Sequence, residues 1–299
     1  MTAVSARPAT APPLPARPAQ ARLFSARRAR RVALNVAAAL FCVVWIFPVY
    51  WMLNTSLKPF RNILTTTPRF VPVPMSMGNF TDAFHQPYFL DNLRNSLIVT
   101  CGVVAASVTI AFLAAVALAR FRFFGRTAFM VVVLLSQMVP PAALLVPLFL
   151  TAQDLNMLNS LAGLGVTYMV FVLPLTIWVL RGFIVGVPVE LEEAARVDGA
   201  GPVTVIRRIL FPLALPGVIA TSVFASITAW NDFLYAYVMM KDQSKYTLPI
   251  WLVSFSTNAG TDYGGLIAAS TVVAVPVIVF FIIIQRRLVA GLSAGAIKG

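Results

Sequence analysis

The chain alternates between long apolar runs and shorter polar segments. Six runs are long enough, or nearly so, to cross a hydrocarbon core as a helix, which takes about 20 residues. They cover residues 32–53, 97–119, 127–150, 161–180, 213–238 and 266–284. A backbone in hydrocarbon must satisfy its own hydrogen bonds, and the alternating pattern of a membrane β-barrel is absent. The pattern therefore predicts an all-α membrane protein with six transmembrane helices.

Two of the runs contain residues that disturb an apolar helix. The third includes the stretch QMVPPAALLVP, whose prolines predict a kinked or partly unwound helix. The fifth contains Asp232, the one charged residue in the six runs. An acid in a span usually marks a function or a buried pair, and Trp230, Asn231 and Asp232 offer a ring and polar groups that suit a sugar. These three residues are candidates for substrate contact or gating, and a role in bracing the outer half of the bundle is an equally good interpretation.

Composition and charge agree with a membrane location. The 299 residues are 59% hydrophobic and only 11% charged, whereas about a quarter of the residues of a soluble domain are charged. The net charge of +13 comes from basic residues beside the apolar runs, which disfavours binding to nucleic acid. Basic residues gather on the cytoplasmic side of membrane proteins. If the N-terminus is cytoplasmic, most of the 23 basic residues fall on that side. With six spans, both termini are then expected in the cytoplasm. The outer segments hold Lys58, Arg61, Arg69, Arg94, Lys241 and Lys245.

The runs divide the chain into segments. Residues 1–31 are rich in Ala, Pro and Arg and predict a disordered basic tail. The first span (32–54) and an extracytoplasmic segment (55–95) follow, then the remaining transmembrane domain (96–288) and a cytoplasmic tail (289–299). The extracytoplasmic segment contains His85, the single histidine, for which a surface or packing role is favoured because Asp82 and Asp91 are weak candidates as metal partners.

Segment 188–216 is charged and broken by glycine and proline although apolar runs flank it. Pro188 can open a helix whose first turn carries glutamates, where the helix dipole favours anions. Gly199 and the residues up to Pro202 stop that helix, and a second one leads back to the membrane. A solvated cytoplasmic loop is the alternative interpretation. The segment holds four of the ten acidic residues, Glu190, Glu192, Glu193 and Asp198.

The sequence contains no phosphate-binding loop, which requires Gly-Lys followed by Ser or Thr. It also lacks a convincing catalytic set, because a Ser-His-Asp triad would have to use His85 and there is no nucleophile-elbow motif. We therefore expect neither an ATPase site nor a cofactor or metal on this chain. Any energised transport would use nucleotide chemistry on another chain.

The stretch EAARVDGAGPVTVIRRILFP resembles the EAA motif of the membrane subunits of ATP-binding-cassette (ABC) importers. In that family the pattern is Glu-Ala-Ala, three residues, Gly, nine residues, Ile, one residue and Leu-Pro. Here Phe211 replaces the usual Leu and keeps the position apolar. The matching residues are Glu193, Ala194, Ala195, Gly199, Ile209 and Pro212.

Further stretches resemble the carbohydrate branch of these permeases, among them ALARFRFFGR, LPLTIWVLRGFI and AWNDFLYAYV. The end of the chain, QRRLVAGLSAGAIKG, resembles the tail of the MalG-type subunit of the maltose importer. The resemblance covers residues from about 31 to 299. It implies the type I ABC importer permease fold in the plasma (inner) membrane of a bacterium, and a permease subunit of a carbohydrate importer.

The resemblance also implies partners and site residues. The partners are a homologous second permease subunit, two ATPase subunits that hold ATP and Mg, an extracytoplasmic sugar-binding protein and the sugar. A secondary transporter driven by an ion gradient, and a membrane-bound enzyme, are the alternatives. In such permeases the segment that corresponds to residues 188–216, here called the coupling segment, contacts the ATPase subunits. Contact is therefore implied for Glu190, Glu192, Glu193, Ala194, Ala195, Asp198, Gly199, Ile209 and Pro212. It is also implied for Gly291, Ser293, Gly295 and Lys298 of the tail.

Overall fold

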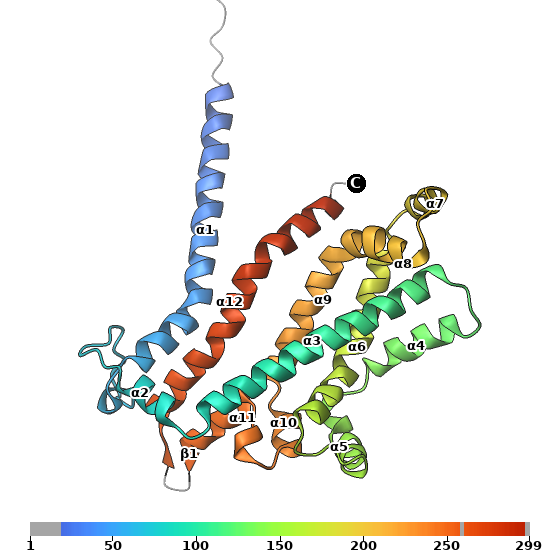
Figure 1. Cartoon of the computed structure of the whole chain (residues 1–299). Coiled ribbons are helices and arrows are strands. Elements are labelled where there is room, and N and C mark those ends of the chain that lie inside the picture. Colours follow the sequence, from blue (N-terminus) through green and yellow to red (C-terminus); the bar gives the residue numbers. More distant parts are fainter. Residues whose placement is uncertain (1–18, 258–259, 297–299) are drawn as a thin grey trace, which may run out of the picture. The chain divides into compact units, whose positions relative to one another are not determined.

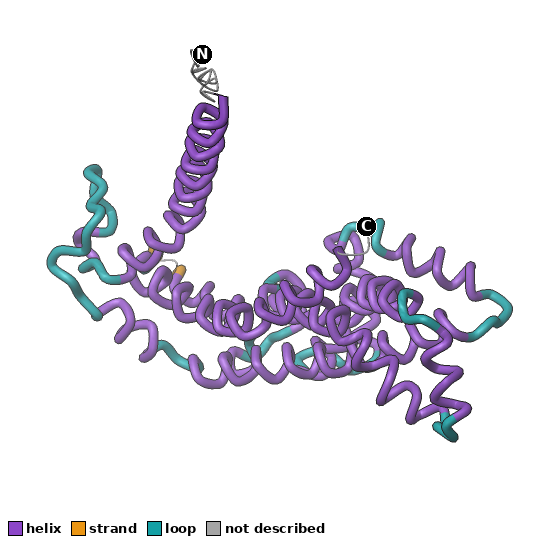
Figure 2. The backbone as a smooth tube through the Cα atoms, turned by 90° about the horizontal axis from the view of Figure 1, so that it is seen from above, coloured by secondary structure: helices purple, strands orange, loops and turns teal. Residues whose placement is uncertain are grey.

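The computed structural model describes residues 19–257 and 260–296, and these residues are mainly helical (Figure 2). The chain divides into two units, Met1–Met52 and Leu53–Gly299. The described part of the first unit belongs to helix α1 (Ala19–Ser56), which contains the predicted first span within Arg30–Ser56. The expected disorder over 1–31 is wrong for residues 19–31, because Ala, Arg and Leu are good helix formers and extend a helix that the span has already nucleated. Residues 1–18 lie outside the described part.

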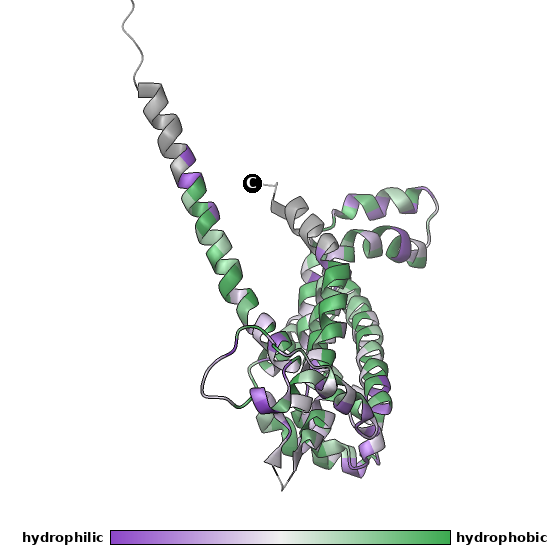
Figure 3. Cartoon of the chain, turned by 90° about the vertical axis from the view of Figure 1, so that its left-hand side faces the viewer, coloured by the Kyte–Doolittle hydropathy of each residue, from purple (hydrophilic) through white to green (hydrophobic). Residues whose placement is uncertain are grey.

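Four long helices form the frame of the second unit (Figure 1). Helices α3 (Phe89–Arg120), α6 (Leu161–Val185) and α9 (Phe211–Asn231) pack against one another, and α12 (Tyr263–Ala296) packs against α9. They contain the predicted runs 97–119, 161–180 and 266–284 and most of the run 213–238. Figure 3 shows that these helices are predominantly hydrophobic, as a lipid environment requires.

The third run is a broken span. It forms α4 (Arg126–Ser136), a short 3₁₀ turn (Pro141–Leu144) and α5 (Leu145–Asp154), with a bend of 101° between the two halves. Pro140 and Pro141 lie at the break, where they remove two amide donors and prevent a continuous helix. The predicted kink is confirmed. Among the described residues there are five candidate spans, or six if the broken pair counts as one.

The fifth span is displaced from its predicted position. It begins with α8 (Pro202–Val205), continues through a π-helical turn (Ile206–Leu210) and ends with α9 at Asn231. The prediction that this span reaches 238 and contains Asp232 is wrong. Asp232 has extended backbone, and a separate short helix, α10 (Leu234–Met239), follows it because the Asp232 carboxylate accepts a hydrogen bond from the Ala236 amide.

Short elements close the end of the second unit that lies opposite α7 (Figure 1). They are η1 (Phe60–Asn62), α2 (Gly78–His85), η4 (Gln243–Lys245), α11 (Leu248–Trp251) and η5 (Leu252–Phe255). A two-stranded hairpin joins them, in which β1 (Ser256–Thr257) pairs antiparallel with β2 (Gly260–Thr261). His85 is exposed and its Nδ1 lies 2.7 Å from the carbonyl oxygen of Thr81, one turn earlier in α2.

Two apolar clusters hold the frame together along its length. One surrounds Leu164, Tyr168 and Met239, and the other surrounds Leu180, Ile184 and Leu210, close to the segment that precedes α9. Helix α12 continues to Ala296, so the boundary expected at 289 does not coincide with the end of a helix. The side chains of Ser293 and its neighbours in the tail are outside the described part, and so is Lys298 entirely.

Candidate functional site

The charged segment folds as the predicted helix, turn and second helix. Helix α7 (Val189–Val197) starts directly after Pro188, and its first turn carries Glu190 and Glu192. A proline is compatible with a helix start because its missing amide would have had no partner there, and the glutamates lie near the positive end of the helix dipole. Arg196 occupies the last turn, where a cation is favoured.

Gly199 forms the turn. Its φ angle is +85°, in the left-handed region that other L-residues seldom adopt. The amide of Ala200 donates to the carbonyl of Ala195 (2.8 Å), and the amide of Gly199 donates to the carbonyl of Arg196 (3.0 Å). This pair of bonds is a Schellman motif, which ends a helix by satisfying its last carbonyl groups. The prediction that Gly199 stands at the turn is confirmed.

The return to the membrane starts at Pro202, the first residue of α8, and passes through the π-helical turn into α9. Val205 and Leu210 are buried and anchor this element, while Arg207 and Arg208 remain exposed. π-helical turns are rare and occur frequently at functional sites. The element therefore presents basic side chains beside α7 on a firmly packed base.

The residues of the EAA-like motif lie mostly on the outer surface of this helix–turn–helix. Ala195 and Ile209 are half-buried and line a hollow of about 410 Å³ between α7 and the returning helix. Thr204 and Arg208 line the same hollow and were not singled out in the sequence. The exposed residues among those predicted to contact the ATPase are Glu190, Glu193, Ala194, Asp198, Gly199 and Pro212.

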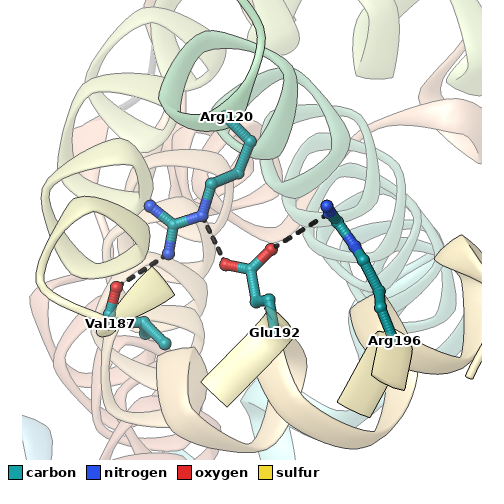
Figure 4. Close-up of polar contacts among 4 residues, drawn as sticks. All are labelled: Arg120, Val187, Glu192 and Arg196. Carbon is teal, nitrogen blue, oxygen red and sulfur yellow. Dashed lines mark hydrogen bonds and ion pairs between the residues drawn. The ribbon is translucent and has the colours of Figure 1, made fainter. Parts of the chain in front are cut away.

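Glu192 behaves differently from the other acidic residues, because it is only 2% exposed. Figure 4 shows its carboxylate between two arginines, with Arg120 from the end of α3 on one side and Arg196 on the other. The Arg120 Nε atom donates to Glu192 Oε1 at 2.5 Å, and the Arg196 Nη2 atom lies 3.9 Å from Glu192 Oε2. The sequence grouped Glu192 with residues that contact the ATPase subunits. This grouping needs correction, because the Glu192 side chain faces the chain's own helices.

Arg120 makes a second contact from the same guanidinium group. Its Nη2 atom donates to the carbonyl oxygen of Val187 at 2.8 Å (Figure 4). Arginine suits this role because its donors form a planar fork that can engage two acceptors at once. The end of α3 is thereby attached both to α7 and to the residue before Pro188. The partners of Arg120 lie 67 and 72 residues further along the chain, so the sequence gives no local signal for this role.

Two of the three candidate substrate residues at the end of α9, Trp230 and Asp232, already make contacts within the chain. Trp230 is buried and its Nε1 atom donates to the carbonyl oxygen of Val273 in α12 (3.2 Å). Asp232 accepts a 2.8 Å hydrogen bond from the hydroxyl of Tyr168 in α6. Asn231 is exposed. These contacts favour the bracing interpretation for Trp230 and Asp232, and contact with a substrate stays a prediction.

The described residues contain no group of three or more potential metal ligands among His, Cys, Asp and Glu. Within these same residues, segment 188–216 presents exposed acids, the exposed basic pair Arg207 and Arg208, a hollow and a buried ion pair beneath them. An arrangement of this kind is suited to docking a partner and to transmitting its movement to α3 and α9.

A frame of apolar helices with a broken span and an exposed helix–turn–helix at one end fits a multi-pass membrane protein. Residues 107–294 match the binding-protein-dependent transport system inner membrane components, and the chain belongs to this family. The predicted family, inner-membrane location and permease fold are confirmed.

Relatives match nearly the whole chain. The diacetylchitobiose uptake system permease protein DasC of Streptomyces coelicolor is 42% identical over 269 residues, covering 90% of this chain and 98% of the relative. The trehalose/maltose transport system permease protein MalG of Thermococcus litoralis is 30% identical, with 90% and 98% covered. Among solved structures, a bacterial ABC transporter that imports the acidic polysaccharide alginate has a chain with a TM-score of 0.75 and 20% identity, covering 91% of this chain and 99% of that chain.

Proposed function

We propose that this chain is the permease subunit of an ATP-driven carbohydrate importer, in which it forms half of the sugar pathway. The supporting observation is the exposed helix–turn–helix around Gly199, in a chain whose family serves binding-protein-dependent transport. Relatives named for the uptake of diacetylchitobiose and of trehalose or maltose support a saccharide as the substrate. The family is a transport component, so ATP and Mg are proposed to bind to the partner ATPase subunits.

The partners follow from the same proposal. An ATPase dimer meets the coupling segment and the end of α12 from the cytoplasm, which places both termini on that side. A second, homologous permease subunit completes the pathway. The opposite end of the frame, with α2, α10 and α11, then faces an extracytoplasmic sugar-binding protein; a solved neighbour of the same fold is an alginate transporter in complex with its periplasmic protein.

The contacts of α7 support a route for the movement. Closure of the ATPase dimer displaces α7, and the Arg120–Glu192 pair passes that displacement to the end of α3. Helix α9 is the later part of the continuous helix from Pro202 to Asn231, so the same displacement also reaches α9. Because α3, α6 and α9 pack as one frame, a rigid displacement of α7 shifts the whole frame rather than bending one helix. The result is alternating access of the pathway to the two sides of the membrane.

The test compares two glycines in the coupling turn. In Gly199→Val a β-branched residue must adopt φ near +85°, which costs at least about 1–2 kcal/mol and distorts the turn. A side chain at Gly201 also meets open space, and Gly201 has an ordinary φ of −73°, so Gly201→Val is the matched control. We expect Gly199→Val to leave insertion and ATP hydrolysis intact but to abolish most sugar uptake by the reconstituted complex.

If the Gly199→Val and Gly201→Val complexes both take up sugar at the wild-type rate, the coupling assignment is wrong. A separate outcome would contradict the energy source. If this chain alone took up sugar in vesicles under an ion gradient without ATP, it would be a secondary transporter.

A further inference from the structure

A cavity of about 310 Å³ lies at the end of the frame opposite α7, between the start of α3, the end of α10 and the segment around α11. It does not include any residue of the coupling segment, and neither Trp230 nor Asp232 lines it, although Trp251 of its lining belongs to the same apolar cluster as Trp230. Every described residue that lines it is uncharged, although the whole chain carries a net charge of +13. Its lining includes Asn92, Gln243 and four large aromatic residues, Tyr88, Tyr237, Tyr246 and Trp251.

One polar group in this lining has no partner within the described part of the chain. Asn92, Asn95 and Ser96 share one face of α3, because they are three and four residues apart. Asn95 Nδ2 donates to the carbonyl oxygens of Ser244 and Tyr246, at 2.9 and 3.0 Å. Ser96 Oγ accepts from the amide of Leu248 at 2.7 Å. Asn92 is 1% exposed, and its Oδ1 atom is buried without a hydrogen-bond partner.

An unpaired buried acceptor is costly, about 1–3 kcal/mol, so it calls for a donor from elsewhere. The neighbouring Asn95 and Ser96 already fasten the loop before α11 to α3. Asn92, the third member of this polar face, is therefore not needed to attach that loop. A hydroxyl group entering the cavity beside the Asn92 side chain would supply the missing donor.

The aromatic residues of the lining combine the buried ring of Trp251 with the exposed rings of Tyr88 and Tyr237. The ring of Trp251 packs against Phe89 and Phe255, with centroids 5.1 Å away in each case, and its Nε1 atom donates to the carbonyl oxygen of Pro87. Tyr237 is 54% exposed and stacks on Phe233. A rigid apolar ring face together with exposed phenol and amide groups suits a ligand that has both apolar faces and hydroxyl groups.

We propose that this cavity is a binding subsite for a short neutral saccharide, which occupies it on the outer side of the membrane before entering the pathway. The uncharged lining disfavours an anionic sugar or a phosphate, and the volume lies at the lower end of ordinary ligand pockets. Ring faces stack on the aromatic side chains, and a sugar hydroxyl donates to Asn92 Oδ1. This inference rests on the proposed function, because the sugar is the expected cargo.

The experiment uses the complete reconstituted importer with its own binding protein. The probes are radiolabelled diacetylchitobiose, trehalose and maltose, each loaded on that binding protein. Asn92→Ala and Tyr237→Ala are compared with Tyr263→Ala, which is similarly exposed (44%) at the start of α12 and does not line the cavity. We expect each cavity variant to lower uptake at saturating binding protein about fivefold to tenfold, as the loss of one hydrogen bond or stacking contact predicts. The control should keep the wild-type rate.

A second measurement separates sugar binding from a structural effect. Tyr237→benzoylphenylalanine places a photoreactive group in the cavity of the intact complex, and irradiation should attach the radiolabelled sugar to this chain. Two results would overturn the inference by showing that the cavity receives a protein side chain. The first is attachment of the binding protein alone. The second is that the cavity variants need a higher concentration of binding protein for half-maximal ATPase stimulation.

The two levels of the proposal fail differently. If the wild-type complex takes up none of the neutral sugars, the proposed function is refuted and the subsite with it. If the wild-type complex transports a sugar, but the cavity variants match it and no sugar is attached, the subsite alone is refuted.

Discussion

Replacing Arg120 with alanine removes the contact that holds α7 against the end of α3. The side chains of Arg120 and Glu192 are 13% and 3% exposed, so the pair is largely shielded from water. The substitution breaks two interactions at once, the ion pair with Glu192 and the hydrogen bond to the Val187 carbonyl. It leaves a buried carboxylate whose nearest remaining cation is Arg196, at 3.9 Å.

The expected size follows from this geometry. Removing one partner of a buried ion pair costs about 3–5 kcal/mol, because the other charge stays buried. Arg196 is 61% exposed and can partly compensate Glu192, so the lower end, about 3 kcal/mol, applies. That value corresponds to a shift of about a hundredfold in the docking equilibrium of α7. Because the pair joins α7 to the frame, the change should appear as local detachment of α7 and not as loss of the whole fold.

The assay follows amide hydrogen exchange in α7 together with sugar uptake per ATP hydrolysed, in the purified and reconstituted complex. Arg120→Ala should speed exchange in α7, spare the centre of α6, and lower the uptake obtained per ATP. Arg196→Ala is the matched control, since an exposed pair at 3.9 Å contributes about 0–1 kcal/mol. The exchanged pair, Arg120→Glu with Glu192→Arg, should recover part of the coupling.

The reasoning would be refuted by equal behaviour of the two arginine variants. If Arg120→Ala and Arg196→Ala change exchange and coupling to the same small extent, the buried pair does not position α7. If Arg120→Ala detaches α7 but uptake per ATP stays normal, the Arg120–Glu192 contact has a structural role only and does not transmit movement.

Two further predictions concern the packing of the frame. Tyr168→Phe removes the hydroxyl that donates to Asp232 at 2.8 Å, and the loss of a hydrogen bond to a charged group should destabilise the protein by about 1.5–3 kcal/mol; an unchanged thermal unfolding midpoint would show that this contact does not brace α6 against the end of α9. Gly217→Ala places a methyl group against the ring of Phe183, a steric conflict that should cost about 1–3 kcal/mol. In a background that carries Phe183→Ala, Gly217→Ala should no longer lower the thermal unfolding midpoint. If it lowers the midpoint as much as in the wild-type background, the conflict with Phe183 is not the cause.

The local features of the chain were predictable from the sequence. The apolar runs identify four of the long helices because a span must be both apolar and about 20 residues long, whatever its neighbours are. The turn at Gly199 was also predictable, since glycine followed by Gly201 and Pro202 is a local signal for ending one helix and starting another. In each of these cases the determining information lies within a few residues.

The errors arose where the outcome depended on competing local signals. The run 213–238 is mostly apolar and carries no charge except Asp232, so hydropathy alone extends the helix past it. The carboxylate instead meets the Tyr168 hydroxyl and the Ala236 amide, and this arrangement ends α9 at Asn231. In the third run the prolines predicted a kink, but the bend of 101° between α4 and α5 depends on how the two halves pack.

Only the tertiary structure decided which charged residue of the coupling segment is buried and what it meets. Glu190, Glu192 and Glu193 are alike in sequence, yet Glu192 alone of the three is buried, because its position on α7 faces the end of α3, where Arg120 lies. The outer cavity likewise combines side chains from α3 and from residues beyond 230. The sequence by itself determined most of the spans, the turn and the motif that marks the family, because these depend on near neighbours and on lipid. Contacts between distant segments depend on how whole helices pack, which a single sequence does not encode in any local pattern.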